Sequence, residues 1–314
     1  MIFCLDASVI DKASAKQLSD LLILICNGNH KLEYTDVAVW TFIEQVVMTT
    51  QNVGQYDIDA FFKNQAMRDI QNNDRDYLRS LTVGSQQGQV DLNSLSIILK
   101  EKSCVVLENS ANEWPVIKRW IDFVKNDREY KDINTKVLSS ITNKSLISEH
   151  AGGGNGTIVT RMEYLAKNTY SDVTCILKMT TLFDFDSDKV SDTDSTSHND
   201  ALISFLTEKH YDYCEWKRRE LENYIPLRVY EACNYCNKRV AAPNTTPNIW
   251  DYTDIGKHPY VKGKYQKKNL PNLALNLDKD AVTETFSNKI YTNPVDKHPI
   301  SELQYVIFLL AKFI

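Results

Sequence analysis

Apolar positions near the start of the chain recur with the period of an α-helix. Four of them follow the i, i+3, i+4, i+7 spacing of a single helix face: Leu18, Leu21, Leu22 and Ile25. Ser14 is a suitable N-cap for this helix, and Asp36 is a suitable N-cap for a second one. A third helix is expected over residues 57–70, and the glycines and small polar residues of 82–93 predict a linker. The pattern therefore predicts a mainly helical N-terminal domain over residues 1–98.

Beyond this linker, short apolar runs alternate with helical spacing. The predicted elements are, in order, a strand over 104–107, a helix from about Pro115, a strand near 145–149, a glycine turn at 152–156, a second helix and a strand that ends within 182–185. Strands that alternate with helices are typical of a parallel sheet. We therefore expect an α/β domain over residues 99–230, with helices flanking its sheet.

The last part of the chain predicts a C-terminal helical extension over residues 231–314. It is richer in Pro, Asn and Lys, and its apolar end predicts a helix over 300–313.

No apolar run reaches the roughly 18 residues that span a bilayer, so no membrane association is expected. The start has no basic segment followed by a long apolar stretch, so we expect no secretion signal. Seven scattered cysteines fit reduced thiols, and the predicted location is cytoplasmic.

The net charge and the cysteine spacing limit which ligands the chain is expected to bind. The net charge of −5 excludes a basic footprint over the whole chain, although it leaves room for a local basic strip. Cys233 and Cys236 form a lone CxxC, and zinc binding needs a second pair of ligands at suitable spacing. The remaining His and Cys residues offer no such pair, so we expect no zinc site.

Acidic residues follow two of the predicted strands. Glu108 closes the run at 104–107, and Asp186 and Asp188 follow the later strand. The carboxyl ends of parallel strands form the ligand crevice of such a sheet, so these residues can converge there. Converging carboxylates repel unless a cation lies between them, and oxygen ligands favour Mg²⁺ or Mn²⁺. Asp184 would face the same side as Asp186 in a strand, so the assignment within this acidic run stays open.

Four stretches in a fixed order carry a resemblance to a known family. VVLENSANEW, GGGNG, DSD and KRRELENYIP resemble the TOPRIM domain, and in particular the stand-alone TOPRIM nucleases of bacterial antiphage defence, which are relatives of the OLD-family nucleases. The resemblance covers roughly residues 103–226. It implies that Glu108, Asp186 and Asp188 are catalytic metal ligands. Many members have an acidic residue four positions after the Glu, where this chain has Asn112 followed by Glu113.

Two later stretches add candidate residues. In KRRELENYIP, the resemblance implies that Glu222 approaches the metal as a catalytic ligand, with Glu220 as the rival, while Arg218 or Arg219 meets phosphate. The alternative is a helix with a solvated basic face.

The strip GKHPYVKGKYQKKNLP interleaves lysines with Tyr260 and Tyr265, a composition that suits phosphates and unpaired bases. Three of its lysines are candidate nucleic-acid contacts: Lys264, Lys267 and Lys268. A late lysine supports the scissile phosphate in the family, which makes Lys264 and Lys268 the candidates and Lys268 the catalytic one. The alternative is a solvated lysine loop.

These observations predict an enzyme, a Mg²⁺-dependent nuclease that hydrolyses phosphodiester bonds in DNA or RNA, with Mn²⁺ as a substitute ion. The resemblance implies a role in antiviral defence and a partner ATPase of the ABC or SMC type. The alternative is a TOPRIM-fold binding or regulatory subunit that acts through the partner ATPase without cleavage of its own.

Overall fold

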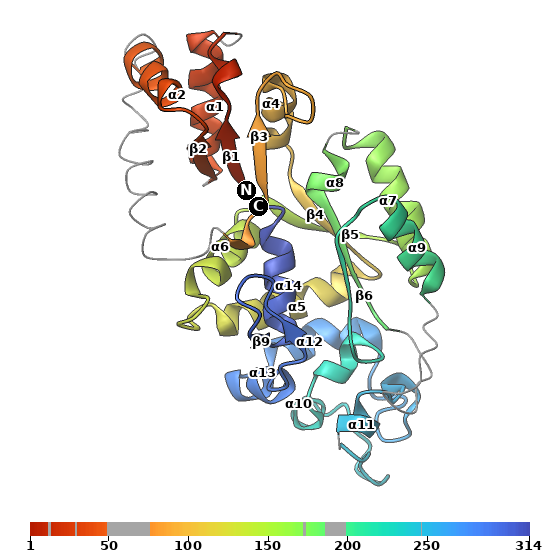
Figure 1. The fold of residues 1–314 in the computed structure, drawn as a ribbon. Coiled ribbons are helices and arrows are strands. Elements are labelled where there is room, and N and C mark those ends of the chain that lie inside the picture. The colour runs from red at the N-terminus through yellow and green to blue at the C-terminus, as the bar shows by residue number, and fades with distance from the viewer. Residues whose placement is uncertain (12–13, 29, 49–75, 172–173, 186–198, 246) are drawn as a thin grey trace. The chain divides into compact units, whose positions relative to one another are not determined.

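The computed structural model describes residues 1–11, 14–28, 30–48, 76–171, 174–185, 199–245 and 247–314 (Figure 1). The chain divides into two compact units. Unit 1 contains Met1–Ser103 and Leu310–Ile314, and unit 2 contains Cys104–Leu309. These units end at different positions from the three regions expected from the sequence.

Unit 1 contains a parallel three-stranded sheet in the order β2-β1-β3. Its elements are β1 (Ile2–Leu5), η1 (Ala7–Val9), α1 (Ala15–Asn27), β2 (Lys31–Tyr34), α2 (Val37–Phe42), η2 (Ile43–Met48), β3 (Ser80–Val83) and α4 (Leu92–Lys100). The central strand β1 is almost completely buried because both of its neighbours and the covering helices exclude water from it. The N-terminal ammonium of Met1 donates to the carbonyl of Ile314, so the two chain ends meet in this unit (Figure 1).

The helix α1 confirms the expectation from the apolar spacing. Its buried face contains Leu18, Leu21, Leu22 and Ile25. The Ser14 side chain accepts a hydrogen bond from the backbone N–H of Gln17, as expected of an N-cap. Asp36 likewise accepts from the backbone N–H of Ala38 at the start of α2.

The described part of the N-terminal region contains this sheet in addition to helices, and the sequence pattern did not predict the sheet. Its strands have four residues each, which is too short for periodicity to separate a buried strand from a turn of helix. The expected linker at 82–93 is an ordered turn. The backbone N–H of Gly84 donates to the carbonyl of Val90, the N–H of Val90 donates to the carbonyl of Thr82 in β3, and Asp91 caps α4. The helix expected over 57–70 lies outside the described residues.

Unit 2 is an α/β unit around a four-stranded sheet in the order β5-β4-β6-β7. Its sheet and the helices next to it are β4 (Ser103–Leu107), α5 (Ser110–Val124), α6 (Lys131–Thr142), β5 (Leu146–His150), α7 (Gly156–Asn168), α8 (Cys175–Lys178), β6 (Met179–Phe183), α9 (Asp200–Glu208) and β7 (Tyr213–Glu215). The strands β4, β6 and β7 run parallel.

The C-terminal part of unit 2 consists mainly of short helices. They are η5 (Leu221–Tyr224), α10 (Leu227–Ala232), α11 (Pro247–Trp250), η6 (Ile255–Lys257), η7 (Lys267–Asn269), α12 (Leu270–Leu275), α13 (Lys279–Thr285), the small hairpin β8 (Tyr291–Thr292) and β9 (Pro299–Ile300), and α14 (Glu302–Ala311). The helix α12 packs against α5, which joins this part to the sheet region.

Both faces of the unit 2 sheet are covered by helices. Alternate residues of β4, Cys104 and Val106, join an apolar cluster with α7 and α9. The helices α5 and α6 contact β5, and Figure 1 shows α7 and α9 together on the other side of the sheet. All residues of β4 and β6 are buried, so both faces of these two strands are covered.

Most elements expected in this region are present, with shifted bounds. The strand expected to end within 182–185 is β6, which ends at Phe183. The helix expected from Pro115 begins five residues earlier, at Ser110, so Pro115 lies inside it. No helix in the described part of the chain has the length and apolar character needed to cross a bilayer.

Candidate active site at the carboxyl ends of β4 and β6

Two acidic residues follow neighbouring parallel strands. Glu108 comes directly after β4 and is half-buried, while Asp184 comes directly after β6 and is 7% exposed. The pairing of Val106 with Thr181 places the ends of the two strands at the same edge of the sheet. The electrostatic influence of Glu108 on Asp184 shows that their charges are close. This edge is where an open parallel sheet binds ligands.

Glu113 joins this edge from the first turns of α5. Its Oε1 accepts a hydrogen bond of 3.1 Å from the backbone N–H of Asn109, and the residue is buried. Side chains of a helix point toward its N-terminus, so Glu113 is directed back toward the end of β4. Burial, followed by the negative charge of Glu108, raises the pKa of Glu113 to about 8.

Asp184 is held by hydrogen bonds from three segments. Its Oδ1 accepts from the backbone N–H of Leu221 at 2.9 Å. Its carbonyl oxygen accepts from Nδ2 of Asn155 at 3.0 Å and from Nδ2 of Asn199 at 2.9 Å. Complete burial raises the pKa of this carboxyl well above its usual range, and the nearby Glu113 and Glu222 raise it further. The site therefore disfavours the ionised form of Asp184 unless a cation is close.

Glu222 reaches the same cluster from η5. It is 2% exposed, and its Oε1 accepts a hydrogen bond of 3.2 Å from the hydroxyl of Tyr265. The hydroxyl of Tyr230 donates to its backbone carbonyl at 3.0 Å. Burial raises the pKa of Glu222, and the charge of Glu108 adds to this effect. Burial and the charge of Glu222 also raise the pKa of the neighbouring Glu220, to about 7.

The positive charge of Lys267 influences the pKa of the four buried or partly buried carboxyls described above. Its charge opposes the rise in the pKa of Glu113, Asp184, Glu220 and Glu222. The residue keeps a large solvent-exposed surface, yet enough protein surrounds it for desolvation to disfavour its charge. The carboxylates, led by Glu222 and Asp184, outweigh that cost and raise the pKa of Lys267.

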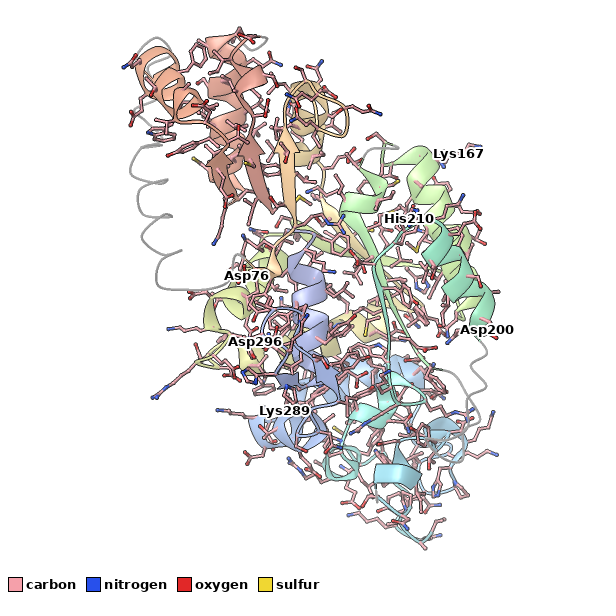
Figure 2. All side chains as sticks on the ribbon, viewed as in Figure 1. Asp76, Lys167, Asp200, His210, Lys289 and Asp296 are labelled. Atoms are coloured by element: carbon pink, nitrogen blue, oxygen red, sulfur yellow. The ribbon has the colours of Figure 1, made fainter. Side chains whose placement is uncertain are left out.

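The structure brings only some of the expected site residues together. Glu108, Glu222 and Lys267 meet at the sheet edge, as do the rivals Asp184 and Glu220. Asp186 and Asp188 lie outside the described residues, so their role as ligands stays a prediction. The segment that contains them ends before Asp200, which Figure 2 places at the start of α9.

The two expected phosphate-binding arginines are engaged within unit 2. Arg218 forms an ion pair of 3.1 Å with Asp251 and donates to the carbonyl oxygen of Asn223 at 2.7 Å. Arg219 forms an ion pair of 3.6 Å with Asp254. Their contact with nucleic acid stays a prediction. These contacts show that both side chains also stabilise the fold.

The lysine strip divides into exposed cations and buried aromatic residues. Lys264 and Lys268 are exposed and accessible to a phosphate backbone. Tyr260 and Tyr265 are 6% and 4% exposed, so the expectation that they stack on unpaired bases is wrong. Tyr265 binds Glu222, and the hydroxyl of Tyr260 donates to Glu231 at 2.8 Å. A buried phenol needs such a partner, which explains why these aromatic residues interrupt a charged strip.

Within the described ranges, no group of three or more His, Cys, Asp or Glu side chains is arranged to hold a metal ion. The donor chemistry nevertheless suits a hard cation. Glu113, Asp184 and Glu222 each have one oxygen fixed by a hydrogen bond. A carboxylate that is held in this way is a pre-oriented ligand.

Sequence reasoning did not assign a role to Glu113 or choose Asp184 over Asp186. A signal for Glu113 was its position in the first turns of the helix that follows Glu108. For Asp184, a signal was its position immediately after the apolar run, because the first residue beyond a buried strand is closest to the sheet edge. Nothing in the sequence pattern pointed to the bonds from Asn155 and Asn199.

No protein-family model, no curated protein and no solved structure matches this chain.

Proposed function

We propose that this chain is a metal-dependent nuclease that hydrolyses phosphodiester bonds in DNA or RNA, using Mg²⁺ or Mn²⁺. The observation that carries the proposal is the convergence of Glu108, Glu113, Asp184 and Glu222 at one edge of a parallel sheet. Several buried carboxylates at one place are costly for the fold, which favours a function that requires them.

The chemistry of the cluster fits a divalent ion bound by oxygen ligands. Burial raises the pKa of Glu113, Asp184 and Glu222, and a nearby divalent cation would reverse these shifts by favouring the ionised forms. We propose that Asp186 and Asp188 supply further ligands, since they lie two and four positions after Asp184 in the sequence. A bound Mg²⁺ supplies an activated water and offsets negative charge on the phosphate.

Other roles would fall to residues of the chain, which would bind the ion and hold the nucleic acid. Glu108, Asp184 and Glu222 orient the ion, while the exposed Lys264 and Lys268 hold the nucleic acid through its phosphates. The resemblance of the strand-end Glu and the ENY segment to TOPRIM nucleases supports this division, and antiphage defence with a partner ATPase is part of the same proposal. Electrostatic support from Lys268 would stabilise charge that develops at the phosphate.

The test is cleavage of supercoiled plasmid and of tRNA by the purified chain with Mg²⁺ or Mn²⁺. We expect E108A, D184N and E222Q each to lower the cleavage rate by about 100-fold or more, because each removes a negatively charged ligand. The matched control is E208A, since Glu208 is exposed at the end of α9 and should leave cleavage unchanged. Absence of cleavage of both substrates with both ions would overturn the proposal.

A further inference from the structure

Residues 231–270 of unit 2 are basic in a chain that is acidic as a whole. They contain seven Lys and Arg against three Asp and Glu, whereas the whole chain has 36 and 41. The three acids already have partners within the fold. Asp251 forms an ion pair of 3.1 Å with Arg218, Asp254 forms one of 2.8 Å with Lys257, and the third acid accepts a hydrogen bond from a tyrosine hydroxyl.

Five cations of this stretch are exposed, and none of them has an ion pair of 4.0 Å or less within the part of the chain that the structure describes. Like charges without nearby counter-charges repel one another, so a ligand with several negative charges gains more from them than a neutral ligand does. We call these five residues the basic surface: Lys238, Arg239, Lys262, Lys264 and Lys268.

The turn after α10, which carries Lys238 and Arg239, is bonded to the lysine strip. The backbone N–H of Asn237 donates to the carbonyl of Tyr260 at 2.5 Å. The hydroxyl of Tyr260 donates to Oε1 of Glu231, which lies in α10, at 2.8 Å. Two stretches that are more than 20 positions apart in the sequence therefore present their cations from one connected part of unit 2.

Aromatic contacts join the same stretches. The ring of Tyr265 lies 6.1 Å from the ring of Tyr235 and 5.3 Å from the ring of Tyr230, measured between centroids. Tyr265 comes two residues before η7, which carries Lys268 and begins with a capping box. The backbone under the basic surface is thus fixed without a ligand, so binding has to order side chains only.

The aromatic residues of this region hold the fold together and do not offer open faces. None of those that the structure describes in residues 231–270 is exposed, and Tyr260 and Tyr265 are 6% and 4% exposed. Proteins that bind unpaired strands usually stack the bases on exposed aromatic rings. A duplex keeps its bases stacked on one another and presents its phosphates, with one negative charge per about 1.7 Å of helix axis.

We infer that the basic surface docks a nucleic-acid duplex through its backbone phosphates, and that Lys238 and Arg239 take part in this contact together with the lysines of the strip. The inference rests on the proposed function in taking nucleic acid as the ligand. It adds the duplex form of that ligand and two contact residues outside the strip. Contacts to phosphates do not read bases, so binding is independent of the base sequence. DNA and RNA duplexes share these phosphates.

The experiment measures binding by fluorescence anisotropy in EDTA, with labelled DNA and RNA duplexes of about 20 base pairs and a single DNA strand of equal length. We expect the wild type to bind a duplex more tightly than the single strand. The logarithm of its affinity should fall with the logarithm of salt concentration with a slope of about −4.5 for five phosphate contacts. The two duplex arms show whether DNA or RNA is preferred.

The decisive variant is K238A/R239A, which changes an exposed turn. It should bind duplex about tenfold more weakly at low salt, with a slope that is less steep by about 2. K238R/R239K keeps both charges and should bind like the wild type. The matched control is R128A/K131A, an exposed arginine and lysine near the start of α6, which should also bind like the wild type. Equal melting temperatures would show that all variants are folded.

Three results would overturn the inference. The first is equal duplex binding by K238A/R239A and R128A/K131A, or no binding of duplex by the wild type. The second is binding of the single strand at least as tight as that of the duplexes. The third is competition by polyglutamate as strong as that by unlabelled duplex, which would assign the surface to an acidic protein. Cleavage needs a metal and is measured separately, so a wild type that binds duplex in EDTA but cuts nothing would contradict the proposed function alone.

Discussion

The backbone N–H of Leu221 donates a hydrogen bond of 2.9 Å to Oδ1 of Asp184. This contact ties the end of the central strand β6 to η5, 37 positions later in the chain. It places Glu222, the next residue, beside the strand end and orients the second oxygen of Asp184 away from the backbone. A single hydrogen bond thus links the two segments that supply buried acids to the candidate site.

This bond leads to a prediction for D184N. Asparagine keeps an oxygen that can accept from Leu221 but removes an ionisable group from a buried position. We expect D184N to abolish metal-dependent cleavage while the metal-free protein becomes more stable to urea, by about 1 kcal/mol or more. The control D280N changes an exposed aspartate of α13 and should alter neither quantity. A strongly destabilised D184N would show that the carboxylate has a purely structural role.

A second prediction concerns the hydroxyl of Tyr265. Y265F removes the donor to the buried Oε1 of Glu222, which costs about 1–3 kcal/mol because the acceptor loses its partner. The pKa of Glu222 should rise further, so the pH at which cleavage is half-maximal should move upward. The comparison variant is Y260F, which loses the same type of bond to the exposed Glu231 and should cost less. Equal urea midpoints for the two variants would contradict this account.

A third prediction concerns Asn155, which is buried just before α7. Its Nδ2 donates both to the carbonyl of Asp184 and to Oδ1 of Asn199. N155A should destabilise the protein by about 1–3 kcal/mol, because two buried acceptors lose a donor. It should also slow cleavage, since the strand end would be less well held. T157A, at an exposed helix start, is the control for helix α7. Wild-type cleavage by N155A would mean that Asn199 and Leu221 hold Asp184 without Asn155.

The fourth prediction is a pH dependence of stability that is independent of the candidate site. Glu302 is 4% exposed, and its carboxylate accepts hydrogen bonds from Tyr224 and from the backbone N–H of Lys217. Burial raises the pKa of Glu302 to about 7, against an unfolded value of 4.5. The folded protein therefore holds this proton more tightly than the unfolded chain. Its stabilising contribution is complete below about pH 4.5 and is lost as the pH rises through about 7.

The measurement is the free energy of unfolding in urea at pH 5 and pH 8. The shift corresponds to about 3 kcal/mol of stability lost across this window. E302Q should lose the part of the pH dependence that Glu302 contributes, because its side chain does not titrate. E208Q changes an exposed glutamate and should retain the wild-type slope. An E302Q protein with the full wild-type slope would place the titrating group elsewhere.

The chain itself contained enough information for part of this description. The apolar run at 104–107 indicated β4, and alternating strands and helices indicated a parallel sheet. Strand direction then predicted that Glu108 would meet acids from a later strand end, since carboxyl ends of parallel strands share one edge. These inferences are local or follow from general rules of sheet geometry, which is why one sequence was sufficient for them.

The tertiary structure alone decided the composition of the cluster. It joined Asp184 to Leu221 by a hydrogen bond and added Glu113 from α5. In the structure, Tyr265 is buried and bonded to Glu222. Unit 1 also contains a sheet in a region where the sequence pattern predicted only helices. Contacts between residues 37 or more positions apart depend on how whole elements pack, and no spacing along the chain encodes them. Short strands are ambiguous for the same reason, because their partners and not their own residues determine whether they form.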